Sequence, residues 1–368
     1  MILNKACLFN AIVFSLASAS RELFVHSSAR STIGRALPLK HGRTPRQKST
    51  KLSDSAVNDA YHNQKRQSHV ELKYVEFSRR KNSGGGVSKG DPVVLLHGLL
   101  GQKRNFASLG SNLASQLKIM RRIYAVDLRN HGENTHDWRE EMSYSDMAED
   151  VLAFLDKHGM ERAILIGHSM GGKVAKSLAL SHPDRITGLV VLDISPVTYT
   201  AQDPSWKAVQ GIIKSLTEVQ LIPGKTKSDI DKDLRESVED PALRQFVLTN
   251  LEVDDNEILR WKINIDAISN QLHKIASFDV NWSSSLEEND TRLLQEDGQK
   301  PENEYRYEGD LFLIKGGASS FVKGSHMPLI SKRFPNYMLT TIRGAGHWIH
   351  AESPDATLAL LKKYLDRY

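Results

Sequence analysis

The chain has 368 residues, of which 40% are hydrophobic and 25% are charged, and its formal net charge is +5. These values are ordinary for a soluble globular protein, and the length allows one large domain or two small ones. The charge does not indicate a nucleic-acid partner, because residues 1–53 hold nine Lys or Arg and one acid, which leaves −3 on the rest.

Residues 1–53 have the composition of a targeting presequence and a disordered basic segment. An apolar run behind Lys5 ends in small residues, which is typical of a signal-peptide core and too short to span a membrane. The acid-poor, Ser- and Arg-rich stretch that follows is typical of a transit peptide. We expect a mitochondrial or plastid protein, with secretion as the alternative. The only cysteine, Cys7, lies here, so neither a thiolate nucleophile nor a Cys-ligated metal is expected in the remainder.

From residue 70 onward, short β-rich runs alternate with stretches of helical periodicity. The runs predict strands over 70–77, 92–98, 122–128, 162–169, 186–195, 311–315 and 337–342. The periodic stretches predict helices over 104–118, 144–158, 171–181, 325–334 and 354–366, the second with Ser145 as N-cap and Gly159 as stop. This alternation predicts an α/β fold with a mostly parallel, doubly wound sheet.

Residues 199–304 interrupt this alternation. Residues 199–280 show mainly helical periodicity, and residues 283–304 are acidic and polar, which is typical of an exposed loop. We therefore predict a core formed by 70–198 and 305–368, with 199–304 inserted as a helical lid that carries an acidic loop.

A candidate nucleophile lies in Gly167-His168-Ser169-Met170-Gly171. This segment matches G-x-S-x-G and stands between an apolar strand and a helix, which is the context that the motif requires. Side chains at the glycine positions would collide with the neighbouring strand and helix, and the helix N-terminus favours developing negative charge. Ser169 is the predicted nucleophile.

A nucleophilic serine needs a base and donors for the oxyanion. His347 follows the last predicted strand on a Gly-Ala-Gly turn, so we predict it as the base, with the nearby His350 outside the chemistry. Residues 97–101 resemble an oxyanion loop, and the predicted donors are the backbone amides of Leu99 and Met170. The predicted binding residues are His97, Gly98 and His168, with His97 stabilising the loop rather than reacting.

The motifs HG-x-x-G, G-H-S-M-G-G, "DLRNHGEN" and G-x-G-H, in this order, resemble the α/β-hydrolase superfamily over residues 70–368. Further strings, including "HGLLGQKRNF", "VLDISPVTY" and "WKINIDAI", resemble the group that contains abhydrolase domain-containing protein 11, YbfF-type esterases and yeast ethanol acetyltransferase. The resemblance implies esterase, thioesterase or acyl-transfer activity with no cofactor or metal, and a mostly mitochondrial location for eukaryotic members.

The catalytic acid is not where the superfamily usually has it. The usual place follows the penultimate strand, here "LFLIKGGASSFV" (311–322), which holds no carboxylate. A histidine base still needs a carboxylate to fix its tautomer. Asp193 ends the strand next along the chain from the nucleophile, and the YbfF-type and acetyltransferase resemblance implies an acid there. Asp266, in the insertion, is the alternative that the abhydrolase 11 resemblance implies.

The leading functional prediction is a serine hydrolase of small-molecule acyl esters or thioesters, in which the lid binds an apolar acyl chain. One alternative is an acyltransferase that passes the acyl group to an alcohol. An alternative of another class is a non-catalytic binding protein on the same fold. No nucleic-acid partner and no integral membrane span are expected, and the oligomeric state is left open.

Overall fold

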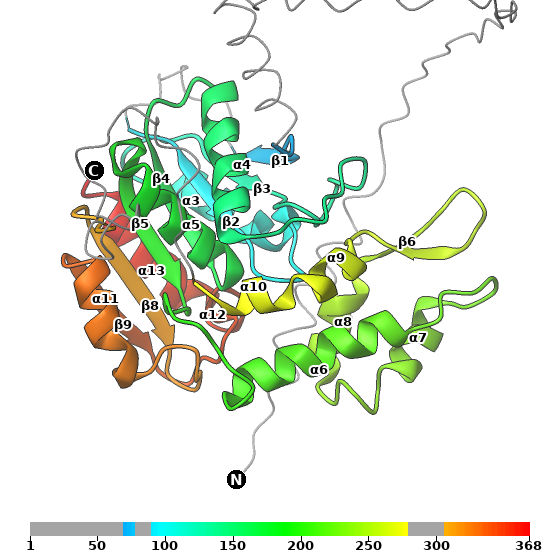
Figure 1. Cartoon of the computed structure of the whole chain (residues 1–368). Coiled ribbons are helices and arrows are strands. Elements are labelled where there is room, and N and C mark those ends of the chain that lie inside the picture. The colour runs from blue at the N-terminus through cyan, green and yellow to red at the C-terminus, as the bar shows by residue number, and fades with distance from the viewer. Residues whose placement is uncertain (1–68, 78–89, 279–304) are drawn as a thin grey trace, which may run out of the picture. The chain divides into compact units, whose positions relative to one another are not determined.

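The computed structural model describes residues 69–77, 90–278 and 305–368 (Figure 1). The predicted targeting segment 1–53 and the predicted acidic loop 283–304 lie outside the described residues. Within the described residues, no helix is both long enough and apolar enough to cross a bilayer.

The centre of the fold is a seven-stranded sheet in the described chain. In spatial order its strands are β1 (Tyr74–Phe77), β3 (Ile123–Val126), β2 (Val93–Leu96), β4 (Ala163–His168), β5 (Ile186–Leu192), β8 (Leu311–Gly316) and β9 (Tyr337–Ile342). Only the edge strand β1 pairs antiparallel in this sheet, and the other pairings are parallel. The predicted fold class is confirmed, and the parallel strands bring their carboxyl ends to one edge.

Helices cover both faces of this sheet. The helices of the core are α3 (Ala107–Gln116), α4 (Tyr144–Lys157), α5 (Met170–Ser181), α11 (Met327–Arg333), α12 (Ile349–Glu352) and α13 (Pro354–Leu365). Helices α4 and α5 pack together on one face, and α3 and α13 pack together on the other. Short 3-10 turns cover Lys103–Phe106, Pro183–Arg185 and Gly324–His326.

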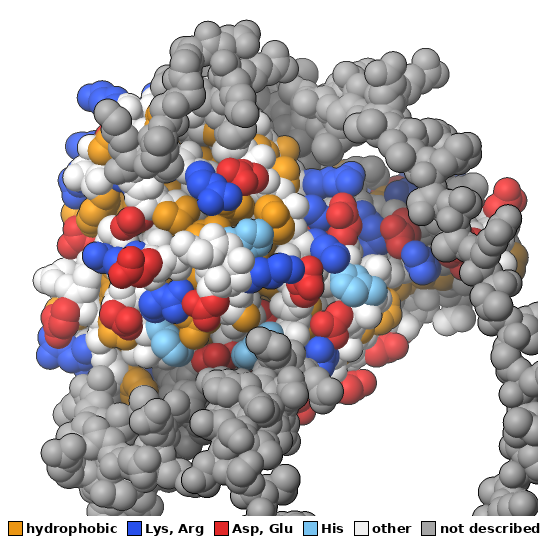
Figure 2. Space-filling view, turned by 90° about the horizontal axis from the view of Figure 1, so that it is seen from above, with side chains coloured by type: hydrophobic (Ala, Val, Ile, Leu, Met, Phe, Trp, Pro, Cys, Tyr) orange, Lys and Arg blue, Asp and Glu red, His pale blue; other side chains and the backbone are white. Residues whose placement is uncertain are grey.

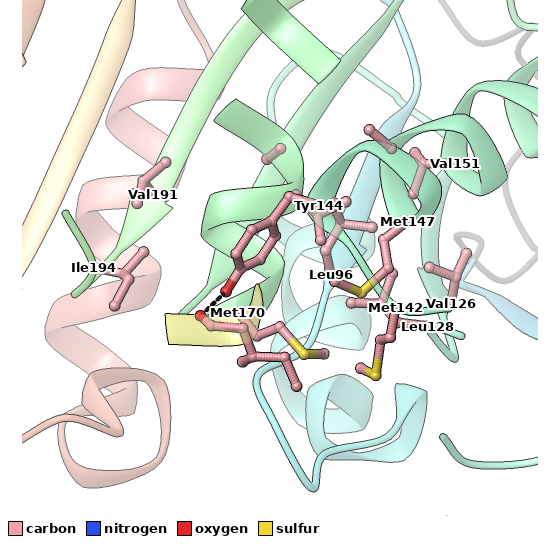
Figure 3. Close-up of a cluster of buried hydrophobic side chains, with 14 of the residues drawn as sticks. Leu96, Val126, Leu128, Met142, Tyr144, Met147, Val151, Met170, Val191 and Ile194 are labelled. Carbon is pink, nitrogen blue, oxygen red and sulfur yellow. Dashed lines mark hydrogen bonds between the residues drawn. The ribbon is translucent and has the colours of Figure 1, made fainter. Parts of the chain in front are cut away.

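Strand β2 shows why a central strand needs a continuous apolar run. Each of its side chains is fully buried, and they alternate between two cores: Val94 and Leu96 contact the α4/α5 side, whereas Val93 and Leu95 contact the α3/α13 side. Figure 3 shows part of the first core, in which Leu96 and Met147 gather near Met170. The residue after the candidate nucleophile is therefore set in the main core.

The start of α4 differs from the prediction. Ser143, not Ser145, is the N-cap, because its side chain accepts from the Asp146 amide while Asp146 accepts from the Ser143 amide. The predicted stop at Gly159 is confirmed by its φ of 61°, which glycine adopts without a steric penalty.

The described segment 199–278, which follows β5, gathers at the end of the sheet to which β4, β5 and β8 point (Figure 1). It holds α6 (Pro204–Glu218), α7 (Lys227–Asp233), α8 (Pro241–Leu248), α9 (Ile265–Asn270) and α10 (Leu272–Ala276), and we call it the lid. The expectation of mainly helical structure is wrong for residues 251–261, which form a hairpin of β6 (Leu251–Val253) and β7 (Leu259–Trp261). Asp254 turns this hairpin by accepting from the amides of Asn256 and Ile258.

The surface has no single sign of charge on the face drawn in Figure 2. Acidic and basic side chains are interspersed there. The basic side chains of the described residues that are visible in this view do not form a stripe of the kind that tracks a phosphate backbone.

Candidate active site

The candidate nucleophile, Ser169, lies where β4 turns into α5. Its backbone has a φ of 50° and a ψ of −119°, a combination that is uncommon for a residue other than glycine. A Cβ at Gly167 would lie 2.2 Å from the carbonyl oxygen of Gly171, and a Cβ at Gly171 would lie 2.3 Å from that of Leu96. Close packing therefore requires glycine at both positions, and the sharp turn leaves Ser169 only partly buried.

His347 lies in the loop between β9 and α12 and contacts both partners that a base would need. Its Nε2 is 2.9 Å from Ser169 Oγ, and its Nδ1 is 2.8 Å from Asp193 Oδ2. An ionised carboxylate only accepts hydrogen bonds, so Nδ1 carries the proton and Nε2 is left to accept from the serine hydroxyl. The structure thus holds the tautomer that serine activation requires.

Asp193 follows β5, and its side chain is fully buried. Its Oδ1 accepts from the Gly316 amide at 2.9 Å, and its Oδ2 accepts from the Ser319 hydroxyl as well as from His347. A buried carboxylate is costly unless its oxygens are hydrogen-bonded. The last residue of β8 and the loop after it, which has no acid of its own, therefore supply donors to the acid that follows the neighbouring strand β5.

The structure places the two acid candidates differently. Asp193 contacts His347, whereas Asp266 is exposed in the first turn of α9, where a carboxylate stabilises the helix dipole. His350 also stays apart from the nucleophile: its ring lies against Phe106 and His168, at centroid distances of 5.2 and 4.6 Å.

The predicted binding residue His168 holds the histidine loop in place. Its Nε2 donates to the His347 carbonyl oxygen at 3.0 Å, and burial lowers its pKa well below the ordinary value, so the ring is neutral. Gly98 packs against it so closely that a Cβ there would lie 2.9 Å from His168 Nδ1. Both residues therefore shape the surroundings of Ser169 through packing.

Two buried histidines fix the predicted oxyanion loop. His97 Nε2 accepts from the Leu128 amide at 2.9 Å, and His131 Nε2 accepts from the Leu100 amide at 3.1 Å. Burial lowers the pKa of His97 to about 4 and that of His131 to about 3, so both rings are neutral acceptors near pH 7. The loop after β3 thus supports the loop after β2, and His97 acts on its shape.

The two predicted oxyanion donors have amides that are available to a ligand. Within the described part of the chain, neither the Leu99 nor the Met170 amide donates a hydrogen bond to another protein group. For Met170 the reason is its place at the first position of α5, where helical amides have no partner inside the helix. An oxyanion would supply the missing acceptor.

One hydrogen bond of the site, from the Ser319 hydroxyl to Asp193, was not predicted from the sequence. Phe321 stacks on the His347 ring at a centroid distance of 4.1 Å, which limits the movement of the imidazole. The sequence does place the Ser319 hydroxyl two residues after Gly317, just beyond the end of β8. That this hydroxyl reaches Asp193 follows only once β5 is known to pair with β8.

The buried histidines predict a loss of stability in mild acid. Burial lowers the pKa of His350 to about 4 from its ordinary 6.5, so unfolding takes up a proton between these pH values. The free energy of unfolding should therefore fall as pH drops from about 6.5 towards 4. His350→Leu removes this titrating group, so the number of protons taken up on unfolding should decrease by up to one and the free energy of unfolding should fall less steeply with pH. Denaturant titration at a series of pH values measures this. An unchanged slope would contradict the assignment.

The described residues contain no group of three or more His, Cys, Asp or Glu side chains arranged to hold a metal ion. The polar groups at the candidate site form a line of hydrogen bonds, from the Ser169 hydroxyl to the His347 imidazole and from there to the Asp193 carboxylate.

Comparison with known proteins agrees with this geometry. Residues 91–216 match the family described as alpha/beta hydrolase fold. The sn-1-specific diacylglycerol lipase ABHD11 of Danio rerio is 36% identical over 72% of this chain and 76% of its own length. The chain belongs to the α/β-hydrolase family.

Other members have related names. Esterase YbfF of Escherichia coli is 30% identical over 79% of this chain and 100% of its own length. A probable alcohol acetyltransferase of Cyberlindnera fabianii is 28% identical over 75% of this chain and 72% of its own length. The solved structure of a marine microorganism esterase superposes with a TM-score of 0.68 at 30% identity, over 80% of this chain and 100% of its own. The resemblance predicted from the motifs is confirmed.

Proposed function

We propose that this α/β-hydrolase is a serine esterase that cleaves carboxylic esters or thioesters through an acyl-enzyme on Ser169. The observation that carries the proposal is the continuous contact from Ser169 Oγ to His347 Nε2, at 2.9 Å, and from His347 Nδ1 to Asp193 Oδ2, at 2.8 Å. The esterase and lipase names of the relatives support the same reaction class.

In the first half of the reaction, Ser169 Oγ forms a bond to the acyl carbon while its proton passes to His347 Nε2. The carbonyl oxygen becomes an oxyanion that accepts from the Leu99 and Met170 amides, and Asp193 stabilises the imidazolium. Collapse breaks the bond to the alcohol or thiol, which leaves with the proton from His347. In the second half, water attacks the acyl-enzyme by the same route and releases the acid.

The lid is the part of the chain that we propose to bind the apolar part of the substrate. Its α8 contributes Phe246, whose ring lies 6.2 Å from that of Trp348, next to His347. The end of the lid that holds α10 is bonded to the core, because Tyr144 Oη donates to the Ile275 carbonyl (Figure 3). Lys173 Nζ donates to the Ala276 carbonyl next to it. A lid held at this edge supplies apolar surface over the nucleophile.

To define the substrate, the purified protein would be assayed on a panel of acyl esters and acyl-CoA thioesters of increasing chain length. We expect turnover of apolar acyl esters. A folded protein that hydrolyses no member of the panel and does not react with serine-directed probes would contradict the proposal and favour the non-catalytic binding protein.

A second candidate is acyl transfer to an alcohol, which the alcohol acetyltransferase among the relatives favours. The acyl-enzyme is the same, and only the final acceptor differs, so exclusion of water decides the outcome. Running the panel with and without ethanol separates the two: hydrolysis yields the acid in both cases, whereas transfer yields the ethyl ester when ethanol is present.

The contact between Ser319 and Asp193 predicts a moderate effect on rate. Ser319→Ala removes one donor to the carboxylate that orients His347, so kcat should fall about 10- to 150-fold, as expected for a lost hydrogen bond to a charged group. Ser319→Thr keeps the hydroxyl and should retain most of the activity. The neighbouring Ser320 bonds only Ser205 among the described residues, so Ser320→Ala is the matched control. Equal effects of the two alanine variants would contradict the role of Ser319.

We further propose that residues 1–53 direct the protein to a mitochondrion or plastid, on the basis of their excess of Lys and Arg. A fusion of residues 1–68 to a fluorescent protein, imaged against organelle markers, tests this. Entry into the secretory pathway would favour the alternative address.

A further inference from the structure

A lid residue, Asn250, is hydrogen-bonded to the predicted oxyanion loop. It lies in the turn between α8 and β6, and its side chain is fully buried. Its Nδ2 donates to the carbonyl oxygen of Leu100 at 2.8 Å. This bond joins two segments that are 150 residues apart in the chain.

The residue that receives this bond has a constrained backbone. Leu100 has a φ of 61°, in the left-handed region that leucine rarely adopts. Its amide donates to His131 in the core, and its carbonyl accepts from Asn250 in the lid. Leu100 directly follows Leu99, the proposed oxyanion donor. The bond to His131 restrains the peptide between Leu99 and Leu100, and the bond from Asn250 restrains the next peptide, on the other side of Leu100. One of the two restraints comes from the lid.

The chemistry of Asn250 indicates that the bond is specific. Its Oδ1 is buried and has no hydrogen-bond partner among the described residues, which is costly for a polar atom. Rotating the amide would bring Oδ1 against the Leu100 carbonyl, so only the observed orientation provides a donor. The backbone of Asn250 is fixed as well, because its carbonyl accepts from the Lys262 amide at 2.7 Å. An apolar side chain would pack here without an unpaired oxygen.

Further contacts hold the same two regions together. Gln102 Nε2 donates to Thr249 Oγ1 at 3.3 Å, next to the Asn250 bond. The Asn264 amide, also in the lid, donates to the Asn130 carbonyl at 3.0 Å, directly before His131. The lid therefore contacts the oxyanion loop and also the loop after β3, whose His131 is hydrogen-bonded to the oxyanion loop.

We propose that Asn250 is a positioning residue that sets the oxyanion loop, so that the oxyanion site is complete only when the lid is docked. This inference rests on the proposed esterase function, because it assigns a lid residue to the oxyanion donors of that reaction. A lid that lifts loses the Asn250 bond and leaves Leu100 held by His131 alone. Substrate that stabilises the docked lid would then also assemble the donors.

Asn250→Leu and the near-isosteric Asn250→Asp remove the donor, and the exposed lid residue Asn256 provides the matched controls Asn256→Leu and Asn256→Asp. The concentration of reactive enzyme is first set by fluorophosphonate titration. We expect kcat per titrated site to fall about 10- to 100-fold in both Asn250 variants, with KM within about threefold, because one oxyanion donor is worth about 10²–10³ in rate. Affinity for an aliphatic trifluoromethyl ketone, whose serine adduct bears an oxyanion, should weaken by a similar factor.

A merely structural role would lower the melting temperature or the fraction of titratable enzyme, but would leave kcat per site and ketone affinity unchanged, and that result overturns the proposal. If neither Asn250 variant folds, Thr249→Val carries the test, since it removes the adjacent acceptor without changing side-chain size and should lower both quantities about two- to fivefold. Wild-type values for Thr249→Val would overturn the proposal in that case. Absence of titration and turnover in the wild type would instead contradict the proposed esterase function itself.

Discussion

Replacing Ser169 by alanine is expected to lower kcat for ester hydrolysis by at least about 10⁴-fold, because no acyl-enzyme can form. The His347 Nε2 that lies 2.9 Å from the hydroxyl would have no group to deprotonate except water. Binding should survive, since the residues around Ser169 are unchanged, so KM or the dissociation constant of a product acid should move little. Stopped assays with excess enzyme would measure the residual rate.

The chain contains a matched control for this experiment. Ser195 Oγ lies 2.8 Å from Nδ1 of His326, a contact as short as that of the candidate nucleophile. Ser195 is fully buried, however, and no carboxylate among the described residues hydrogen-bonds to His326. Ser195→Ala should therefore keep kcat within about tenfold of wild type. A loss of activity in Ser195→Ala alone would point to the wrong serine.

Asp193→Asn is expected to have the second-largest effect, a fall in kcat of about 10⁴-fold with the fold intact. The asparagine amide can donate to His347 Nδ1, which would move the imidazole proton to Nε2 and remove the acceptor for the Ser169 hydroxyl. Gly316 can still donate to the remaining oxygen, and the Ser319 hydroxyl can accept from the new amide group, so the side chain keeps its place.

Asp266→Asn is the control for this variant. Asp266 is exposed in α9, so its substitution should change kcat by no more than about twofold. Far-ultraviolet circular dichroism and thermal unfolding would show that both proteins are folded. If Asp266→Asn abolishes turnover while Asp193→Asn does not, Asp266 is the acid and the assignment of Asp193 is wrong.

The sheet could be predicted from the sequence because each of its strands carries its own signal. The apolar run at 92–98 and the strand–turn–helix context of Ser169 are local patterns, and the helices between them have clear periodicity. Parallel pairing then brings the ends of β4, β5 and β9 to one edge, which is why Ser169, Asp193 and His347 could be nominated together.

Features that depend on contacts between distant segments could not be read in the same way. The bond from Ser319 to Asp193 requires β8 to lie beside β5, and that of Asn250 to Leu100 requires the lid to dock on the oxyanion loop. The hairpin at 251–261 was missed because its strands are shorter than a period-based reading can resolve. The N-cap of α4 was predicted at Ser145 instead of Ser143 because both serines lie near the start of the helix, and only their hydrogen bonds show which of them is the cap.

The most direct measurement of the central claim is covalent labelling with a fluorophosphonate, followed by mass spectrometry of the modified peptide. The account predicts a single adduct on Ser169, formed by the folded wild-type protein, absent in Ser169→Ala and much slower in Asp193→Asn. Labelling that persists in Ser169→Ala, or a folded wild-type protein that does not react at all, would contradict it.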